Sequence, residues 1–187
     1  MSSNIYFIKS AKSPKDFPNL DIPEFAFIGR SNVGKSSLIS KITNNSSLVK
    51  TSKTPGQTSA INFFMYGKSV LVDLPGYGYS GSGIKSMHEY SDLILSYILN
   101  SKNMLVLFLL IDFRIEPKES DIKMIESLQE VGLNFFITFT KIEKVKENHI
   151  LEENIFAHVS RDRAIYTSSR SGDGIKKIRN MITSRVL

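Results

Sequence analysis

The chain has 187 residues, 41% of them hydrophobic and 22% charged, with a formal net charge of +6 and no cysteine. One globular domain is expected over residues 1–187, with a short N-terminal extension over 1–22, and disulfides, thiolate chemistry and cysteine-ligated zinc are excluded. The longest apolar run, Met104 to Ile111, falls far short of the ~20 residues that a membrane helix needs, and the first ten residues lack a secretory apolar core. We therefore expect a soluble, cytoplasmic protein with no membrane partner.

Strands and helices alternate along the chain. Short apolar runs bounded by turn residues predict strands, and apolar residues three or four positions apart predict helices. The expected strands are Glu24 to Ile28, Ile61 to Tyr66, Ser69 to Leu74, Met104 to Ile111, Leu133 to Phe139 and Ala164 to Tyr166. The expected helices are Lys35 to Thr43, Ile84 to Leu99, Pro117 to Val131, about Lys144 to Val159, and a last one that carries Ile175, Ile178, Ile182 and Val186.

This alternation predicts an α/β fold of three layers, in which a mostly parallel sheet of six or seven strands is flanked by helices. Gly67-Lys68 separates two adjacent strands and predicts a hairpin there. Met104 to Ile111 is continuously apolar, as in a strand that is covered on both faces. Such sheets bind their ligands at the carboxyl ends of the strands.

A phosphate-binding loop stands between the first strand and the first helix. It reads Gly29-Arg30-Ser31-Asn32-Val33-Gly34-Lys35-Ser36, a complete GxxxxGKS/T match. Its glycines let successive amides face the phosphates, Lys35 reaches the β and γ oxygens, and the Ser36 hydroxyl ligates Mg²⁺. Asn32 is placed to ligate a monovalent cation such as K⁺, or alternatively to stabilise the loop by a hydrogen bond. We expect Lys35 and Asn32 to take part in catalysis.

Two further segments complete the expected phosphate and Mg²⁺ site. In Asp73-Leu74-Pro75-Gly76, Asp73 would hold Mg²⁺ through water and the Gly76 amide would meet the γ-phosphate, unless the segment is a plain turn. In Thr54-Pro55-Gly56-Gln57-Thr58, Thr58 is the expected second direct ligand of Mg²⁺, with Thr54 as its rival and a passive turn as the alternative. The γ-phosphate would order this loop, and hydrolysis would release it.

Two strand ends are expected to read the base. Thr140-Lys141-Ile142-Glu143 stands where an (N/T)KxD loop is expected, with glutamate in place of aspartate. Its carboxylate would accept the N1 and N2 hydrogens of guanine and reject adenine, at a cost of roughly 1 to 2 kcal/mol for the longer side chain. The alternative is that Glu143 caps the next helix. Thr167-Ser168-Ser169 would present backbone amides to the guanine O6.

Two rival functions stay open at this stage. In an ATPase, Asp112 would be the Mg²⁺ carboxylate instead of Asp73. Tyr77 stands where small GTPases usually carry the glutamine that orients the attacking water, so intrinsic hydrolysis should be slow, and a nucleotide-binding module with little turnover is the second rival.

The C-terminal part of the chain is basic. Residues 160–187 carry seven basic side chains against Asp162 and Asp173, a local balance of +5. This charge would attract a phosphate-rich partner such as RNA, although a solvated lysine face is the alternative. No DNA partner is expected.

Taken together, GRSNVGKS, KTPGQT followed by INFF, and VDLPGYGY resemble the EngB (YihA/YsxC) family of bacterial GTPases of the TRAFAC class. The resemblance covers most of the chain, from Phe7-Ile8-Lys9-Ser10-Ala11 to the terminal helix. It implies a Ras-like P-loop NTPase fold that binds GTP and Mg²⁺. It also implies a partner in the precursor of the large ribosomal subunit and its rRNA, and a requirement for normal cell division and septation. A switch of this size is expected to be a monomer.

The resemblance also assigns site residues. It gives GTP contacts to Gly29 through Ser36, to Gly56, Gln57, Thr58, Ser59 and Ala60, to Asp73 through Gly76, to Thr140 through Glu143 and to Thr167 through Ser169. It gives Mg²⁺ to Ser36 and Thr58. Glu143 departs from the aspartate of the family, which bears on base affinity and not on the fold.

Overall fold

The computed structural model describes residues 5–45, 60–77, 84–144 and 153–184, with only the backbone described over 84–91. The strands are β1 (Ile5–Ala11), β2 (Glu24–Gly29), β3 (Ile61–Tyr66), β4 (Ser69–Asp73), β5 (Met104–Asp112), β6 (Phe135–Thr140) and β7 (Ala164–Tyr166). The helices are α1 (Lys35–Thr43), α2 (Ile84–Asn100), α3 (Glu119–Glu130), α4 (Glu153–Phe156) and α5 (Ile175–Ser184), with 3-10 turns at Pro14–Asp16, Ile142–Lys144 and Arg161–Arg163.

One seven-stranded sheet forms in the order β1-β3-β4-β2-β5-β6-β7. β2 runs parallel to β4 and β5, and β6 runs parallel to β5 and β7, whereas β3 is antiparallel to both β1 and β4. The predicted mostly parallel sheet and its hairpin are therefore confirmed. The strand β1 lies inside the expected N-terminal extension. This strand was not predicted, because an edge strand that is half exposed shows no regular alternation of apolar and polar residues.

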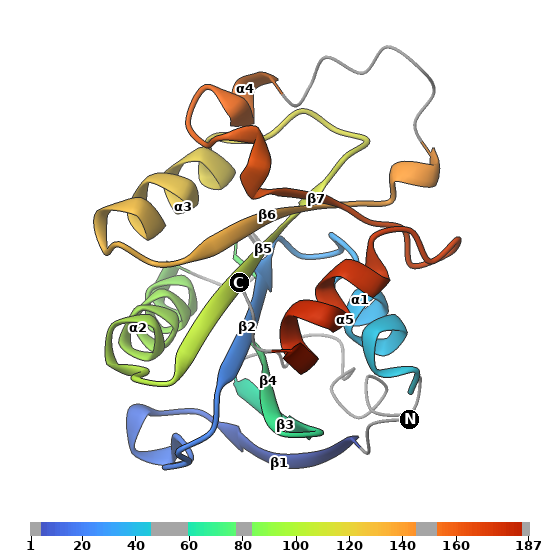
Figure 1. The fold of residues 1–187 in the computed structure, drawn as a ribbon. Coiled ribbons are helices and arrows are strands. Elements are labelled where there is room, and N and C mark those ends of the chain that lie inside the picture. Colours follow the sequence, from blue (N-terminus) through green and yellow to red (C-terminus); the bar gives the residue numbers. More distant parts are fainter. Residues whose placement is uncertain (1–4, 46–59, 78–83, 145–152, 185–187) are drawn as a thin grey trace.

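Helices cover both faces of this sheet, α2 and α3 on one and α1 and α5 on the other (Figure 1). Alternate residues of β2 point to opposite faces. Phe25 and Phe27 join the core under α1 and α5, while Ala26 and Ile28 join the core under α2 and α3. The whole strand is buried, so the loop that follows it starts from a rigid base.

One helix differs from its expected bounds. Within the range from about Lys144 to Val159, Lys144 ends a 3-10 turn and a helix, α4, covers Glu153–Phe156, while residues 145–152 lie outside the described part. The turn after Phe156 is tight, because His158 donates its amide to the carbonyl oxygen of Ile155, three residues back. The chain must reverse there to enter β7. Val186, predicted in the last helix, also lies outside the described residues.

The turn between β7 and α5 lies against the backbone of β7. Gly174 has a φ of +69°, and a Cβ there would lie 2.1 Å from the carbonyl oxygen of Tyr166. Only glycine fits this turn, which positions the segment from Thr167 to Gly172 at the carboxyl edge of the sheet.

We predict that Gly174→Ala destabilises the protein far more than Gly132→Ala. Gly132 has a similar φ of +67° but no atom within 4 Å of an added Cβ, so that variant should cost only the roughly 1–2 kcal/mol of a left-handed alanine. Gly174→Ala must also displace the β7 backbone and should cost at least ~3 kcal/mol. Urea unfolding of both variants measures the difference. Equal losses of stability would show that the turn is not sterically confined.

Candidate functional site

The phosphate-binding loop connects β2 to α1 and is held by the end of β6. Asn32 and Gly34 adopt left-handed backbone conformations, with φ of 65° and 108°. The Thr140 hydroxyl donates a hydrogen bond to the carbonyl oxygen of Val33 at 2.7 Å, and Lys141 Nζ donates one to the carbonyl oxygen of Asn32 at 2.7 Å. The carbonyl oxygens of Val33 and Asn32 therefore each accept a hydrogen bond from the end of β6 or the residue after it. The loop ends at the N-terminus of α1, where free amides favour an anion.

The segment that follows β4 lies directly on this loop. The Lys35 ammonium forms an ion pair with the Asp73 carboxylate, and these side chains are only 11% and 8% exposed. Leu74 and Pro75 are buried behind it. A Cβ on Gly76 would lie 3.1 Å from the carbonyl oxygen of Gly29, so Gly76 touches the loop backbone. The two predicted phosphate segments are thus neighbours in space.

Asp112, at the end of β5, is engaged in a separate clamp. Its carboxylate accepts two hydrogen bonds from the Arg114 guanidinium, at 2.9 and 2.8 Å, and one from Lys141 Nζ at 2.7 Å. Burial would raise the pKa of Asp112, but the hydrogen bonds and charges of Arg114 and Lys141 outweigh it and lower the pKa to about 2. The carboxylate that the ATPase alternative assigns to Mg²⁺ therefore already holds two cationic groups, one of them the lysine that also contacts the phosphate-binding loop.

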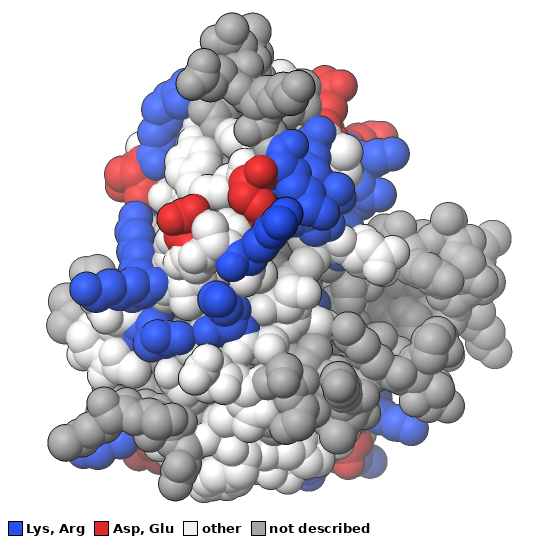
Figure 2. Space-filling model, turned by 90° about the vertical axis from the view of Figure 1, so that its right-hand side faces the viewer, with Lys and Arg blue, Asp and Glu red and all other residues white. Residues whose placement is uncertain are grey.

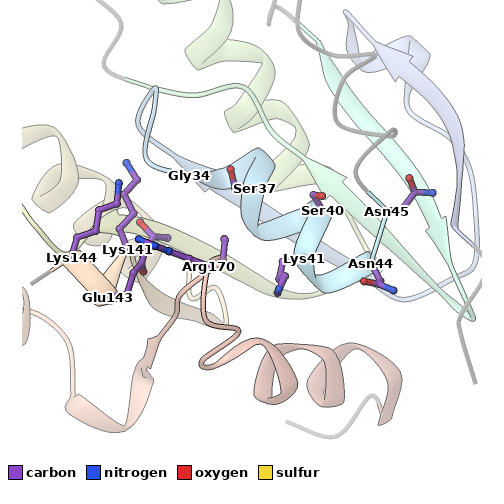
Figure 3. A pocket seen from close by; sticks show the side chains of 12 residues that line it. Gly34, Ser37, Ser40, Lys41, Asn44, Asn45, Lys141, Glu143, Lys144 and Arg170 are labelled. Atoms are coloured by element: carbon purple, nitrogen blue, oxygen red, sulfur yellow. The ribbon is translucent and has the colours of Figure 1, made fainter.

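A pocket of about 640 Å³ opens beside the phosphate-binding loop and α1 (Figure 3). Its wall is formed mostly by residues with polar or charged side chains: Gly34, Ser37, Ser40, Lys41, Asn44, Asn45, Thr140, Lys141, Glu143, Lys144, Ser169 and Arg170. Lys141, Glu143, Lys144 and Arg170 gather at one end in Figure 3, with Ser37 and Ser40 of α1 further along. Both predicted base-reading segments contribute to this pocket.

The buried Ser168 organises the base-reading end. Its hydroxyl oxygen accepts hydrogen bonds from the amides of Arg170 at 3.1 Å and Ser171 at 2.9 Å. A side-chain hydrogen bond from Ser168, with weaker effects of nearby cations, lowers the pKa of Glu143. The Glu143 carboxylate is therefore ionised at neutral pH and held next to the turn of Thr167-Ser168-Ser169.

The backbone amides of that turn are not equally available. Thr167 donates its amide to the carbonyl oxygen of Phe139 at 2.7 Å, and Ser168 donates its amide to that of Asp173 at 3.1 Å. Among the described residues only the Ser169 amide of the three has no hydrogen bond. A guanine O6 would meet this amide first, or would displace Asp173 from the Ser168 amide.

The remaining predicted residues are placed as follows. Ser36 stands in the first turn of α1, Ile142 lies between the base-reading residues, and Ala60 is buried just before β3. Outside the described residues lie the expected nucleotide contacts Gly56, Gln57, Thr58 and Ser59, and Thr54, the rival of Thr58 as Mg²⁺ ligand.

Sequence reasoning missed three supporting side chains: the Thr140 hydroxyl, the Asp112 carboxylate as a clamp, and the Ser168 hydroxyl. Each lies at or just after the carboxyl end of a strand, which was the available signal. Asp112 bonds Arg114 two residues away and Lys141 29 residues away, and Thr140 bonds Val33 107 residues away, so the sequence offered a local signal only for part of these contacts.

Comparisons with known proteins agree with this arrangement. A family model described as a 50S ribosome-binding GTPase matches residues 24–141. A probable GTP-binding protein EngB of Ehrlichia canis (strain Jake) is 48% identical over 155 residues, which cover 82% of this chain and 77% of that protein. One of Rickettsia akari (strain Hartford) is 41% identical over 182 residues, covering 95% and 86%.

Solved structures agree as well. A crystal structure of a probable GTP-binding protein EngB matches with a TM-score of 0.72 and 26% identity, covering 86% of this chain and 97% of the other. Within the described residues, no helix is both long and apolar enough to span a membrane. With its phosphate-binding loop, its adjoining Asp73 segment and its base-reading pocket, the chain belongs to the EngB family of GTP-binding proteins.

Proposed function

We propose that this chain binds GTP with Mg²⁺, hydrolyses it slowly, and works as a conformational switch in assembly of the large ribosomal subunit, with cell division and septation depending on it. The observation that carries the proposal is the ion pair between Lys35 and Asp73. It joins the phosphate-binding loop to the segment that must sense the γ-phosphate. A change at the phosphates is thereby communicated to a second loop.

The donor set around Lys35 fits Mg²⁺. Ser36 offers a hydroxyl and Asp73 a carboxylate, both hard oxygen donors, and Thr58 is the proposed further ligand. Within the described residues, no group of three or more His, Cys, Asp and Glu could hold a metal ion by itself. This suits an ion whose other ligands are phosphate oxygens and water. When bound, Mg²⁺ would neutralise charge on the phosphates.

In this proposal Lys35 exchanges partners. Its ammonium leaves Asp73 for the β and γ oxygens of the nucleotide, and Asp73 becomes free to hold a Mg²⁺ water. The Gly76 amide, which already lies against the loop, donates to the γ-phosphate. Asn32 provides a ligand for K⁺, whose charge would substitute for that of an arginine finger.

Guanine recognition rests on Glu143. Its carboxylate accepts the N1 and N2 hydrogens of guanine, which adenine lacks, and it is the one acid among the described residues that line the pocket. The hydrogen bond from Ser168 fixes its direction. Binding would be selective because an unpaired carboxylate facing adenine costs free energy.

The ribosomal part of the proposal is supported by the matching family model and by charge. Lys41, Arg170, Lys176 and Lys177 are exposed around α1 and α5. On this side of the molecule Lys and Arg outnumber Asp and Glu (Figure 2). Such a surface favours the phosphate groups of rRNA through counterion release.

We predict that the effect of Asp73→Asn on the affinity for GDP depends on Mg²⁺. In EDTA the variant should bind GDP as tightly as the parent or a few-fold tighter, because no carboxylate competes for Lys35. With Mg²⁺ the parent should gain more affinity than the variant. Titration with a fluorescent GDP measures both. A variant that loses the same factor under both conditions would contradict the exchange of partners by Lys35.

We also predict that single-turnover GTP hydrolysis is faster in K⁺ than in Na⁺ at fixed ionic strength, and faster still with large ribosomal subunits. Asn32→Ala should remove the difference between the two cations without changing the fold. Equal rates in K⁺ and Na⁺ would reject the cation role of Asn32. The ribosomal part of the proposal would be rejected if large ribosomal subunits neither changed the rate of hydrolysis nor cosedimented with the protein in a GTP-dependent way. The protein would then be a nucleotide-binding module.

A further inference from the structure

The residue after Gly76 is tied to both the phosphate-binding loop and a helix. Tyr77 forms an isolated parallel β-bridge with Arg30. The Tyr77 hydroxyl donates a hydrogen bond to Asp121 Oδ1 on α3 at 2.7 Å, and its ring packs against the core under α2 and α3. Burial and the Asp121 carboxylate raise the pKa of Tyr77 well above its usual value, so the hydroxyl keeps its proton.

Asp121 is a buried acid with two separate tasks. It is only 3% exposed. One oxygen accepts the Lys118 amide at 2.8 Å and caps the first turn of α3, while the other accepts the Tyr77 hydroxyl. Capping the helix requires only one of these oxygens. A buried carboxylate is costly unless it is hydrogen-bonded, and the Tyr77 hydroxyl satisfies the second oxygen, so the same acid also holds the segment after β4.

The contact between Tyr77 and Asp121 lies beside the phosphate-binding loop. Arg30 and Asp121 line the same cavity of about 320 Å³, together with Ser31 and Asn32. Arg30 Nε is buried and has no hydrogen-bond partner among the described residues. The hydroxyl of Tyr77 therefore connects to α3 beside the loop that is proposed to hold the phosphates.

We infer that Asp121 is a positioning residue for GTP hydrolysis: through the Tyr77 hydroxyl it fixes the Gly76 amide against the phosphate-binding loop. Gly76 is the direct neighbour of Tyr77, and its Cα approaches the backbone of Gly29 and Ser31 closely. α3 is anchored in the core by Ile125 and Leu128. The helix α3 thus fixes the position of the Gly76 amide, the proposed donor to the γ-phosphate. The inference rests on the proposed GTPase function.

The test compares Tyr77→Phe, Asp121→Asn and the double variant in single-turnover GTP hydrolysis and in GDP titration. Tyr77→Phe keeps the ring and removes only the hydroxyl, so it should fold. Each single variant should hydrolyse GTP about tenfold more slowly while binding GDP within about twofold of the parent, because GDP lacks the phosphate that Gly76 meets. The double variant should be no slower than the slower single one, since both remove the same contact.

Glu119→Gln is the matched control, because Glu119 is on the same helix turn but pairs only with the exposed Lys123. It should leave hydrolysis unchanged. Unchanged hydrolysis in Tyr77→Phe, or equal losses for GTP and GDP, would overturn the inference and reduce the contact to packing. If the parent protein binds GDP but hydrolyses no GTP, the proposed function fails first and the inference fails with it, which separates the two outcomes.

Discussion

The ion pair between Lys35 and Asp73 is the contact on which the rest of the site depends. Asp73 is the last residue of β4, and Lys35 begins α1 after the loop that follows the adjacent parallel strand β2. A lysine ammonium that is only 11% exposed needs a negative charge beside it, and Asp73 supplies that charge. The same geometry offers the lysine to a phosphate. In the proposed function, a nucleotide would take the place of Asp73 at this ammonium.

A second clamp on the other side of β2 completes the frame. Asp112, at the end of β5, holds Lys141, and Lys141 in turn holds the carbonyl oxygen of Asn32. The phosphate-binding loop is thus fixed from both neighbouring strands. Lys35 pairs with Asp73 at the end of β4, whereas Glu143 follows β6 and is hydrogen-bonded by Ser168, which follows β7. In the proposed function the phosphates would therefore be held on the β4 side and the base on the β6 and β7 side.

Much of this arrangement was predictable from sequence, and the exceptions have physical reasons. Continuous apolar runs predict buried strands such as Met104–Asp112, and the glycines and the lysine of the GxxxxGKS/T motif predict the phosphate-binding loop. The edge strand β1 and the short α4 were missed or misjudged, because half-exposed elements depend on neighbours rather than on their own pattern. The contacts between Asp112 and Lys141 and between Asp121 and Tyr77 were beyond sequence reasoning, since they join residues 29 and 44 positions apart.

The proposed function requires that this site select guanine nucleotides through Glu143. Competition between fluorescent GDP and unlabelled ATP, in Mg²⁺, tests this for the parent protein, Glu143→Asp and Glu143→Ala. We expect tight GDP binding that ATP does not displace in the parent and in Glu143→Asp, with loss of this preference in Glu143→Ala. Equal displacement by ATP and GDP in the parent would contradict it, and would identify a general P-loop nucleotide-binding protein whose base pocket does not read guanine.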